Sequence, residues 1–195
     1  ILRILPLKTK VVIMPKLSQI RINSGNLKGR KLSVPAPAHP MGSREKLALF
    51  NTLGPSIYGK VFLDLFAGSG ALGIEALSRG ADFCVFVEKD RSAANIITEN
   101  LKDLGLSEKA LVVKASAEQF VFSDAFKKAQ FDFILADPPY SGFSQLSPDF
   151  FQNLISSTSS FVLSHPTSFQ PQTLGLSPRI TKKYAGAQLS FFTTG

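Results

Sequence analysis

From Lys60 onward, the hydrophobic and polar positions alternate between short apolar runs and segments with helical spacing. The apolar runs span residues 60–66, 82–88, 109–115, 131–136 and 160–165, and the helical segments span residues 71–80, 90–105, 117–128 and 147–156. Continuous apolar runs are typical of parallel strands that are buried on both faces. Strands that alternate with helices indicate a mostly parallel sheet covered by helices on both sides. We therefore predict a doubly wound α/β fold.

The two ends of the chain depart from this alternation. The C-terminal segment "PRITKKYAGAQLSFFTT" contains two strand-like runs that meet at Ala185-Gly186. This pattern predicts an antiparallel C-terminal hairpin at the edge of the sheet, which brings the expected number of strands to seven. Residues 19–34 predict a small separate hairpin with a turn at Asn23 to Asn26, and residues 35–42 form a proline-rich connector.

Capping residues set the boundaries of the predicted helices. Side chains that can accept from the first turn stand at Ser43, Asp90 and Ser147, and glycines that end a helix stand at positions 54, 80 and 105. The first helix, between Ser43 and Gly54, carries Leu47, Leu49, Phe50 and Leu53 at helical spacing.

A chain of 195 residues is expected to form one domain with a small appendage. We expect residues 1–17 to be disordered or to lie upstream of the true start. Residues 18–54 form a basic hairpin and helix, and residues 55–195 form the main α/β domain. The first 16 residues lack acids, and their apolar runs are too broken for a secretory signal. A transit peptide and a start at Met14 both remain open.

The charge of the chain is concentrated in its first third. The formal net charge is +8, and residues 1–60 hold eleven Lys or Arg against a single acid, Glu45. Such asymmetry favours a polyanionic partner, most often a nucleic acid, over a basic face that only aids solubility. No apolar run reaches the ~18 residues of a membrane helix. A single cysteine, Cys84, and two histidines exclude an internal disulfide and a standard zinc site, so we expect no metal.

A glycine-rich segment follows the first long strand. Gly68, Gly70 and Gly73 spell G-x-G-x-x-G, and Glu88 ends the next strand, where it can accept hydrogen bonds from ribose hydroxyls. This pattern fits both dinucleotide and S-adenosylmethionine sites. Asp64 favours the second, because a carboxylate would repel a pyrophosphate but attract the cationic end of S-adenosylmethionine. The alternative for both acids is a loop-capping role.

The segment Asp137-Pro138-Pro139-Tyr140 follows the strand 131–136. Proline cannot donate to a sheet and restricts the residue before it, so the chain leaves the sheet in a stiff, extended form. The segment places one carboxylate and one aromatic ring beyond the strand's carboxyl end, where open α/β sheets bind ligands. A rigid turn without function is the alternative.

Longer stretches of this chain resemble one family. The segments "GNLKGRKLSVP", "LFNTLG", "FLDLFAGSGALGIEALSRGA" and "DPPY" are similar to the RsmD family, bacterial methyltransferases that act on guanine N2 of small-subunit (16S) ribosomal RNA. The resemblance covers residues 18–193. It implies a Rossmann-like class I methyltransferase fold, S-adenosylmethionine as cofactor, and ribosomal RNA as partner, either free or within an assembling small subunit. It also implies a monomer in the cytoplasm with no membrane attachment.

The resemblance also implies roles for individual residues. Catalysis is expected from Asp137, Pro138, Pro139 and Tyr140, with the carboxylate and the Pro138 carbonyl accepting from a base amine and the tyrosine stacking on the base. Cofactor contacts are expected from Asp64, Phe66, Gly68, Gly70, Glu88, Lys89, Ser116, Ala117 and Asp137. RNA contacts are expected from Arg21, Lys28, Arg30, Lys31, Arg44 and Lys46, although each could be an ordinary solvated charge.

Several positions depart from the family's pattern. In the segment from His39 to Arg44, Arg44 matches the family's usual Arg-Pro-Thr and Asp-Arg, but the first Arg, the Thr and the Asp are replaced. Ser116 stands where an adenine-contacting Asp or Asn is common, and Ser164 replaces an acid. Four alternatives remain: an amine methyltransferase for DNA adenine, one for protein glutamine, an NAD-dependent dehydrogenase, and an inactive RNA-binding homologue. The dehydrogenase explains neither Asp64 nor the Asp-Pro-Pro-Tyr segment.

Overall fold

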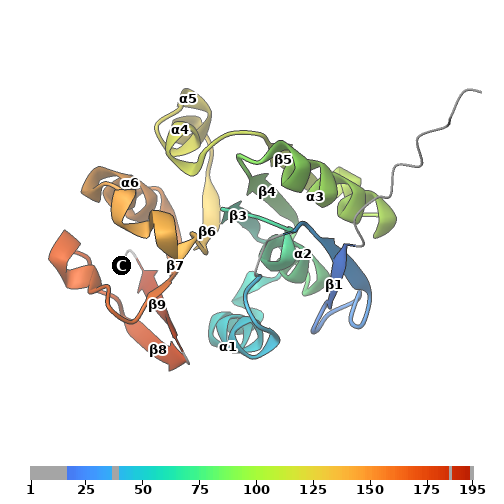
Figure 1. Ribbon diagram of the computed structural model, residues 1–195, viewed down its shortest axis with the longest axis horizontal. Coiled ribbons are helices and arrows are strands. Elements are labelled where there is room, and N and C mark those ends of the chain that lie inside the picture. Colours follow the sequence, from blue (N-terminus) through green and yellow to red (C-terminus); the bar gives the residue numbers. More distant parts are fainter. Residues whose placement is uncertain (1–16, 37–39, 185, 194–195) are drawn as a thin grey trace, which may run out of the picture.

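The structure is a computed structural model that describes residues 17–36, 40–184 and 186–193. The expectations for residues 1–16, His39 and Ala185 lie outside these ranges. Two sheets are present in the described part, one of seven strands and one of two (Figure 1). The strand order of the large sheet is β5-β4-β3-β6-β7-β9-β8, and the small sheet pairs β1 with β2.

The seven-stranded sheet confirms the predicted topology. Its strands are β3 (Val61–Leu65), β4 (Phe83–Val87), β5 (Ala110–Val113), β6 (Phe131–Ala136), β7 (Thr158–Pro166), β8 (Ile180–Tyr184) and β9 (Ala187–Thr193). Strands β3 to β7 pair in parallel, and β9 pairs antiparallel with both β7 and β8. The C-terminal hairpin therefore forms the sheet's edge, as expected. The small N-terminal sheet consists of β1 (Ser18–Arg21) and β2 (Lys31–Val34).

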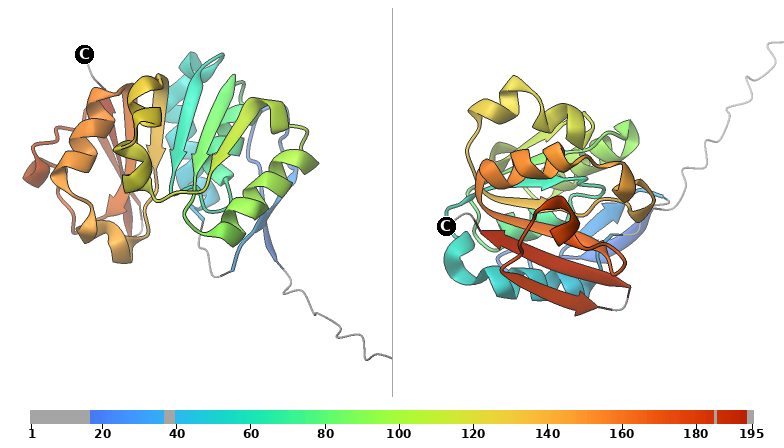
Figure 2. Two further views of the ribbon diagram at one scale, coloured as in Figure 1. Left: turned by 90° about the horizontal axis from the view of Figure 1, so that it is seen from above. Right: turned by 90° about the vertical axis from the view of Figure 1, so that its left-hand side faces the viewer.

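Helices cover both faces of the large sheet (Figure 2). They are α1 (Ser43–Leu53), α2 (Ala71–Ser78), α3 (Arg91–Asp103), α4 (Ala117–Val121), α5 (Asp124–Lys128) and α6 (Pro148–Ser156). Short 3₁₀ helices lie at η1 (Gly54–Ile57), η2 (Ser107–Lys109), η3 (Tyr140–Gln145) and η4 (Pro171–Leu174). Residues of α1, α2 and α3 join one hydrophobic cluster, and residues of α4, α5 and α6 join the cluster on the opposite face.

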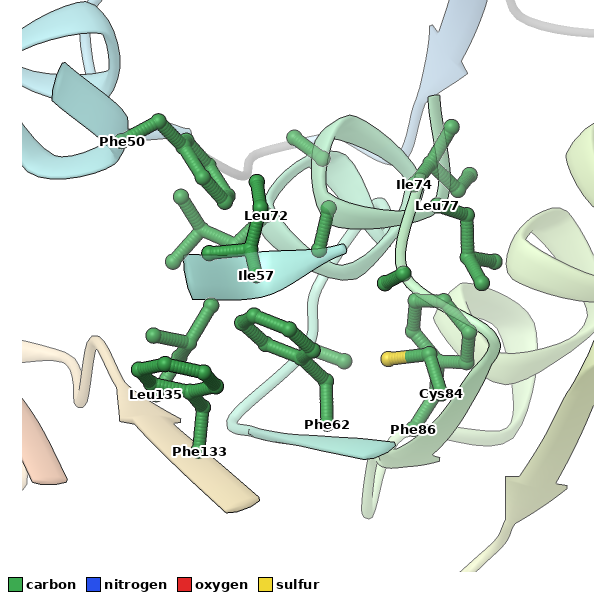
Figure 3. Packing of buried hydrophobic residues seen from close by; sticks show 14 of the residues in the cluster. Phe50, Ile57, Phe62, Leu72, Ile74, Leu77, Cys84, Phe86, Phe133 and Leu135 are labelled. Carbon is green, nitrogen blue, oxygen red and sulfur yellow. The ribbon is translucent and has the colours of Figure 1, made fainter. Parts of the chain in front are cut away.

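The first hydrophobic cluster shows why α2 can lie close to the sheet (Figure 3). Phe62 and Phe133 stack on neighbouring strands with ring centroids 4.8 Å apart. A Cβ atom at Gly73 would lie 2.3 Å from Cε1 of Phe86 and 2.6 Å from Sγ of Cys84. The third glycine of the G-x-G-x-x-G segment thus permits close packing of the helix on the strand. Cys84 is a buried core thiol.

Two helix boundaries differ from the prediction. Residues 117–128 form two helices instead of one, because the side chain of Ser123 accepts from the backbone N–H of Phe126 and begins a second helix. Gly42, not Ser43, is the N-cap of α1, and no side chain caps that end. The N-caps expected at Asp90 and Ser147 are confirmed by their hydrogen bonds to Ala93 and Phe150.

The N-terminal hairpin packs along α2 and α3. Asn100 joins it in the middle: its Oδ1 accepts from the backbone N–H of Ser33 at 2.9 Å, and its Nδ2 donates to the Ser33 carbonyl at 2.9 Å. At the hairpin tip, the N–H of Asn26 donates to the carbonyl of Ser78, the last residue of α2. The tip therefore lies at the C-terminal end of α2, away from the glycine-rich segment that precedes this helix.

Candidate active site

A cavity of about 900 Å³ opens beyond the carboxyl ends of the central strands. The chain runs from β3 outward to β5 and then returns to β6 on the other side of β3, so the strand order reverses there. Ligands of open α/β sheets bind at such a switch point. Eleven of the predicted site residues line the cavity: Asp64, Phe66, Gly68, Glu88, Lys89, Ser116, Ala117, Asp137, Pro138, Pro139 and Tyr140. Segments far apart in the sequence thus meet in one site.

Asp64 stands at the end of β3 with a buried side chain. Its Oδ2 accepts from the backbone N–H of Gly73 at 2.9 Å, which ties the strand end to α2. Burial raises the pKa of Asp64 well above its usual value, the Gly73 hydrogen bond opposes this, and the nearby carboxylates of Asp137 and Glu88 add to it. The carboxyl is therefore held in a position that a cationic ligand would stabilise.

The loop after β3 is held in an unusual backbone conformation. Phe66 has φ 59°, the only positive φ of a non-glycine residue in the described ranges. The N–H of Gly68 donates to Oε2 of Glu88 at 2.8 Å, and the N–H of Ala67 donates to the carbonyl of Val87. Such strained positions persist where the surroundings hold them and concentrate at functional sites. The loop is thus fixed against the end of β4.

Gly70 differs from the expectation that it contacts the cofactor. It is not among the residues that line the cavity. A Cβ atom at this position would lie 3.2 Å from Cγ2 of Ile97 and 3.3 Å from Cδ1 of Ile74. Its φ of 76° starts α2 as an αL N-cap. The turn and the core thus account for the glycine.

Glu88 is fixed by two backbone groups at the end of β4. Its Oε2 accepts from Gly68, and its Oε1 accepts from the N–H of Asp90 at 2.8 Å. Each carboxylate oxygen has a further lone pair, so the side chain can still accept from two hydroxyls. This arrangement suits the two vicinal hydroxyls of a ribose.

Ser116 forms a capping box at the start of α4. Its Oγ accepts from the N–H of Gln119 at 3.1 Å, while its own N–H donates to Oε1 of Gln119 at 3.2 Å. The hydroxyl hydrogen remains able to donate into the cavity. Ser116 can therefore act as a donor, where the Asp common in the family would act as an acceptor.

The Asp137-Pro138-Pro139-Tyr140 segment forms the wall next to β6 and β7. Burial raises the pKa of Asp137, and a side-chain hydrogen bond with Ser164 opposes the increase. Pro138 is buried, whereas Tyr140 is 44% exposed at the start of η3. Burial also raises the pKa of Tyr140, with Ser164 opposing and the charges of Asp137 and Glu45 adding. An acceptor thus lies inside the cavity and an aromatic ring lies at its mouth.

The cavity lining also contains polar residues that were not predicted, among them Glu45, Ser69 and Glu118. With Glu45 and Glu118, the lining holds five carboxylates and one lysine. Ser69 is 3% exposed, and its hydroxyl has no hydrogen-bond partner among the described residues. The only sequence signal for Glu45 was that it is the single acid in the basic first third. The carboxylates favour a cationic ligand, and the hydroxyl of Ser69 and the lysine can donate to acceptor groups on it.

The basic residues of the first third do not form one group. Arg21, Lys28, Arg30, Lys31 and Arg44 are exposed, as the RNA prediction requires. The RNA contact predicted for Lys46 is wrong, because its side chain is 2% exposed and its Nζ lies 3.4 Å from Oε2 of Glu75. Its Nζ also donates to the carbonyl of Arg21 at 3.3 Å. Lys46 is thus an internal ion-pair partner and not an RNA contact.

The hairpin cations lie far from the cavity. Nη2 of Arg30 donates to the carbonyl of Asp103 at the C-terminal end of α3. Arg44 is different: it lies in the first turn of α1, between Gly42 and Glu45, which both line the cavity. Within the described ranges, no group of His, Cys, Asp and Glu could hold a metal ion. None of the helices in those ranges is long and apolar enough to cross a membrane.

The family described as "Conserved hypothetical protein 95" matches residues 20–187. The chain belongs to this family. Ribosomal RNA small subunit methyltransferase D of Haemophilus influenzae is 42% identical over 125 residues, which span 63% of this chain and 64% of that relative. The match therefore covers less than two thirds of the relative's length. The resemblance to the RsmD family is confirmed.

Solved structures share the fold of this family member. The yhhF protein of Escherichia coli superposes with a TM-score of 0.78 and 30% identity, over 90% of this chain and 98% of that one. A Thermus thermophilus 16S rRNA N2 G1207 methyltransferase, solved with AdoMet and guanosine, gives a TM-score of 0.69 at 24% identity, over 93% of this chain and 52% of that one. The predicted class I methyltransferase fold is thus confirmed.

Proposed function

We propose that the protein transfers a methyl group from S-adenosylmethionine to the exocyclic N2 amine of a guanine in small-subunit ribosomal RNA. One observation carries the proposal: the Asp137-Pro138-Pro139-Tyr140 segment lines the same cavity as Gly68 and Glu88. The carboxylate of Glu88 holds the loop that contains Gly68. The name of the Haemophilus influenzae relative supports ribosomal RNA as the substrate. Under this proposal the enzyme acts as a monomer in the cytoplasm, on free RNA or an assembling subunit.

The residues of the cavity fit S-adenosylmethionine. The volume of about 900 Å³ lies within the range of small-molecule sites. Asp64 and the other carboxylates would stabilise the cationic amino acid end, Glu88 would accept from the ribose, and Ser116 would donate toward the adenine. The unpartnered hydroxyl of Ser69 adds a buried group that a polar ligand would satisfy. When bound, the cofactor supplies a methyl group already activated on a sulfonium.

Asp137 and Pro138 would orient the guanine amine. The amine has two N–H donors, and the Asp137 carboxylate and the Pro138 carbonyl can each accept one. Two acceptors at fixed angles favour a tetrahedral nitrogen, whose lone pair would otherwise be delocalised into the ring. Positioning of this kind contributes up to ~7–11 kcal/mol in ideal cases. The carboxylate also stabilises the positive charge that develops on the nitrogen.

Tyr140 would hold the base at the entrance. Its exposed ring offers a flat face on which an unstacked guanine can rest. Enzymes that modify a base must take it out of its stack before they can reach it. The half-exposed position of Tyr140, near the partly buried acceptor Asp137, suits a base that enters from the surface.

The proposal is tested by methyl transfer to ribosomal RNA isolated from a bacterial strain that lacks its own enzyme of this activity. Radiolabelled S-adenosylmethionine would be supplied, and the modified base mapped by mass spectrometry. We expect label in one guanine as N2-methylguanine, and none with Asp137→Ala. Label in adenine, DNA or protein glutamine would identify a different substrate. Absence of label together with cofactor binding would support an inactive RNA-binding homologue.

A further inference from the structure

The C-terminal hairpin β8–β9 contributes to the wall of the cavity. Ala187 and Leu189 of β9 line it, as do Gly42 and Glu45 at the N-terminal end of α1. Figures 1 and 2 show β8 and α1 on the same side of the molecule. Residues of α1 and of this hairpin therefore line the same cavity as Asp137.

The hairpin belongs to a purely basic part of the chain. Residues 150–195 contain Arg179, Lys182 and Lys183 but no Asp or Glu, whereas residues 61–149 hold thirteen acids and eight Lys or Arg. None of the ion pairs in the described part of the chain includes any of these three cations. A second basic segment, separate from the first third, thus lies beside the cavity.

Strand register separates the two lysines of β8. Lys182 pairs with Leu189, and Tyr184 pairs with Ala187. Cross-strand partners point to the same face and have Cβ atoms about 5 Å apart. Lys182 and Tyr184 therefore lie on the face of the sheet that borders the cavity. Lys183 pairs with Gln188 and points to the opposite face.

Lysines on an edge strand often serve only to prevent edge-to-edge aggregation. That role does not depend on which face of the sheet a lysine occupies, because either face protects the edge. The position of Lys182 is more specific. Its cross-strand partner Leu189 lines the cavity, and the exposed Arg44 of α1 adjoins Glu45, which also lines it, so both cations lie near the cavity.

We propose that the β8–β9 hairpin is an RNA-binding element in which Lys182 contacts a backbone phosphate next to the target base. Together with Arg44, it would hold the strand on both sides of the unstacked nucleotide. Such contacts position the substrate without reading its sequence. The inference rests on the proposed function for the identity of the polyanion, since the cavity acts on a base of that RNA.

Two neighbouring variants test the proposal, Lys182→Ala and the matched control Lys183→Ala, which removes the same charge from the same strand. Binding to ribosomal RNA would be measured at several salt concentrations, with methyl transfer measured separately. We expect Lys182→Ala to raise the KM for RNA several-fold and to reduce the slope of log affinity against log salt by ~0.7–0.9, one phosphate contact. Affinity for S-adenosylmethionine and kcat at saturating RNA should not change. Lys183→Ala should leave the slope closer to that of the wild-type protein.

Equal losses in the two variants would overturn the proposal, because they would reflect net charge alone. Unchanged RNA affinity in Lys182→Ala would overturn it as well, as would a wild-type protein that binds no RNA. The proposed function fails separately, through wild-type protein that binds RNA but transfers no methyl group. In that case a selective effect of Lys182→Ala would still establish the hairpin as an RNA-binding element.

Discussion

Asp137 presents an acceptor to the cavity from a partly buried position, where burial opposes its ionised form. We expect Asp137→Ala to leave cofactor affinity intact and to lower turnover by ~10²–10³, the usual effect of removing one aimed interaction. Asp137→Asn keeps an acceptor oxygen and should retain much more activity than the alanine variant. The measurement is kcat for methyl transfer in all three proteins. Equal loss in both variants would show that Asp137 acts as a base or through its charge, and near-full activity in Asp137→Ala would remove its catalytic role.

The pH dependence of the same residue gives a second prediction. Burial raises the pKa of Asp137, so its carboxylate form is lost as the pH falls through that raised value, earlier than for an exposed aspartate. We expect a plot of kcat/KM against pH to fall on its acidic side in the wild-type protein. This decrease should be absent in Asp137→Asn. Since a raised folded pKa means that ionisation opposes folding, Asp137→Asn should also be more stable than wild type at neutral pH, with the difference shrinking in acid. If kcat/KM still falls in acid in the asparagine variant, the titration of another group causes the decrease.

Glu88 supports a prediction about cofactor binding. Removing its carboxylate in Glu88→Ala would take away hydrogen bonds to the ribose, each worth ~1.5–3 kcal/mol to a charged acceptor. The same change frees the N–H groups of Gly68 and Asp90, so the loop itself would loosen. Glu88→Gln keeps one acceptor oxygen and should lose less. Calorimetric titration with S-adenosylmethionine would measure both, and unchanged affinity in Glu88→Ala would contradict the assignment.

At the scale of elements, α1 contains two neighbouring cations with different roles. Lys46 lies in a buried network with Glu75, whose Oε1 pairs with Nε of Arg79 at 2.9 Å, while the guanidinium of Arg79 lies 4.9 Å from the ring of Phe50. Glu75 also accepts from the backbone N–H of Asn23. The network therefore joins the N-terminal hairpin, α1 and α2.

This network predicts opposite effects for two alanine variants of α1. Lys46→Ala should destabilise the protein by ~3 kcal/mol, the lower end for breaking a buried ion pair, because Arg79 still pairs with Glu75. Lys46→Met fills the same space and should lose less. Arg44→Ala should leave stability unchanged and weaken RNA binding. Urea denaturation would measure the stability of all three variants, and titration with RNA would measure their RNA affinity. Weaker RNA binding without loss of stability in Lys46→Ala would show that Lys46 contacts RNA after all.

The sequence predicted the strands well because doubly buried strands require continuous apolar runs. It also predicted which residues gather at the cavity, because they stand where those strands end. Local competition explains part of what was missed: the Ser123 hydroxyl began a new helix inside a segment with helical spacing. Lys46 shares the helical face of Leu49, Phe50 and Leu53, a spacing that signals burial. Its partner Glu75 lies on another helix, however, and no local pattern identifies such a pairing.

Across the whole molecule, charge is sorted by location. Five carboxylates line the cavity, while exposed cations lie at its rim and on the N-terminal hairpin. The net charge of +8 thus describes the outer surface better than the site. A polyanion is attracted to the outside of the protein, and a cation is stabilised within the cavity. The same protein can therefore hold a negatively charged RNA and a positively charged cofactor at adjacent positions.

The distance between the two basic regions leads to the last prediction. The tip of the N-terminal hairpin lies at the C-terminal ends of α2 and α3, one helix length of ~12 Å or more from the cavity edge where α2 begins. An RNA must therefore extend several nucleotides beyond the target base to contact both regions. Arg30→Ala combined with Lys31→Ala should therefore weaken binding of full-length ribosomal RNA and flatten its salt dependence by about one phosphate per residue. Binding of a short oligonucleotide centred on the target base should not change, whereas Arg44→Ala should weaken both. Equal losses for long and short RNA in the double variant would place the hairpin at the cavity mouth in the complex. Loss of S-adenosylmethionine affinity instead would show that the hairpin supports the cofactor site. The connection would run through Asn100, whose side chain donates to the carbonyl of Ser69.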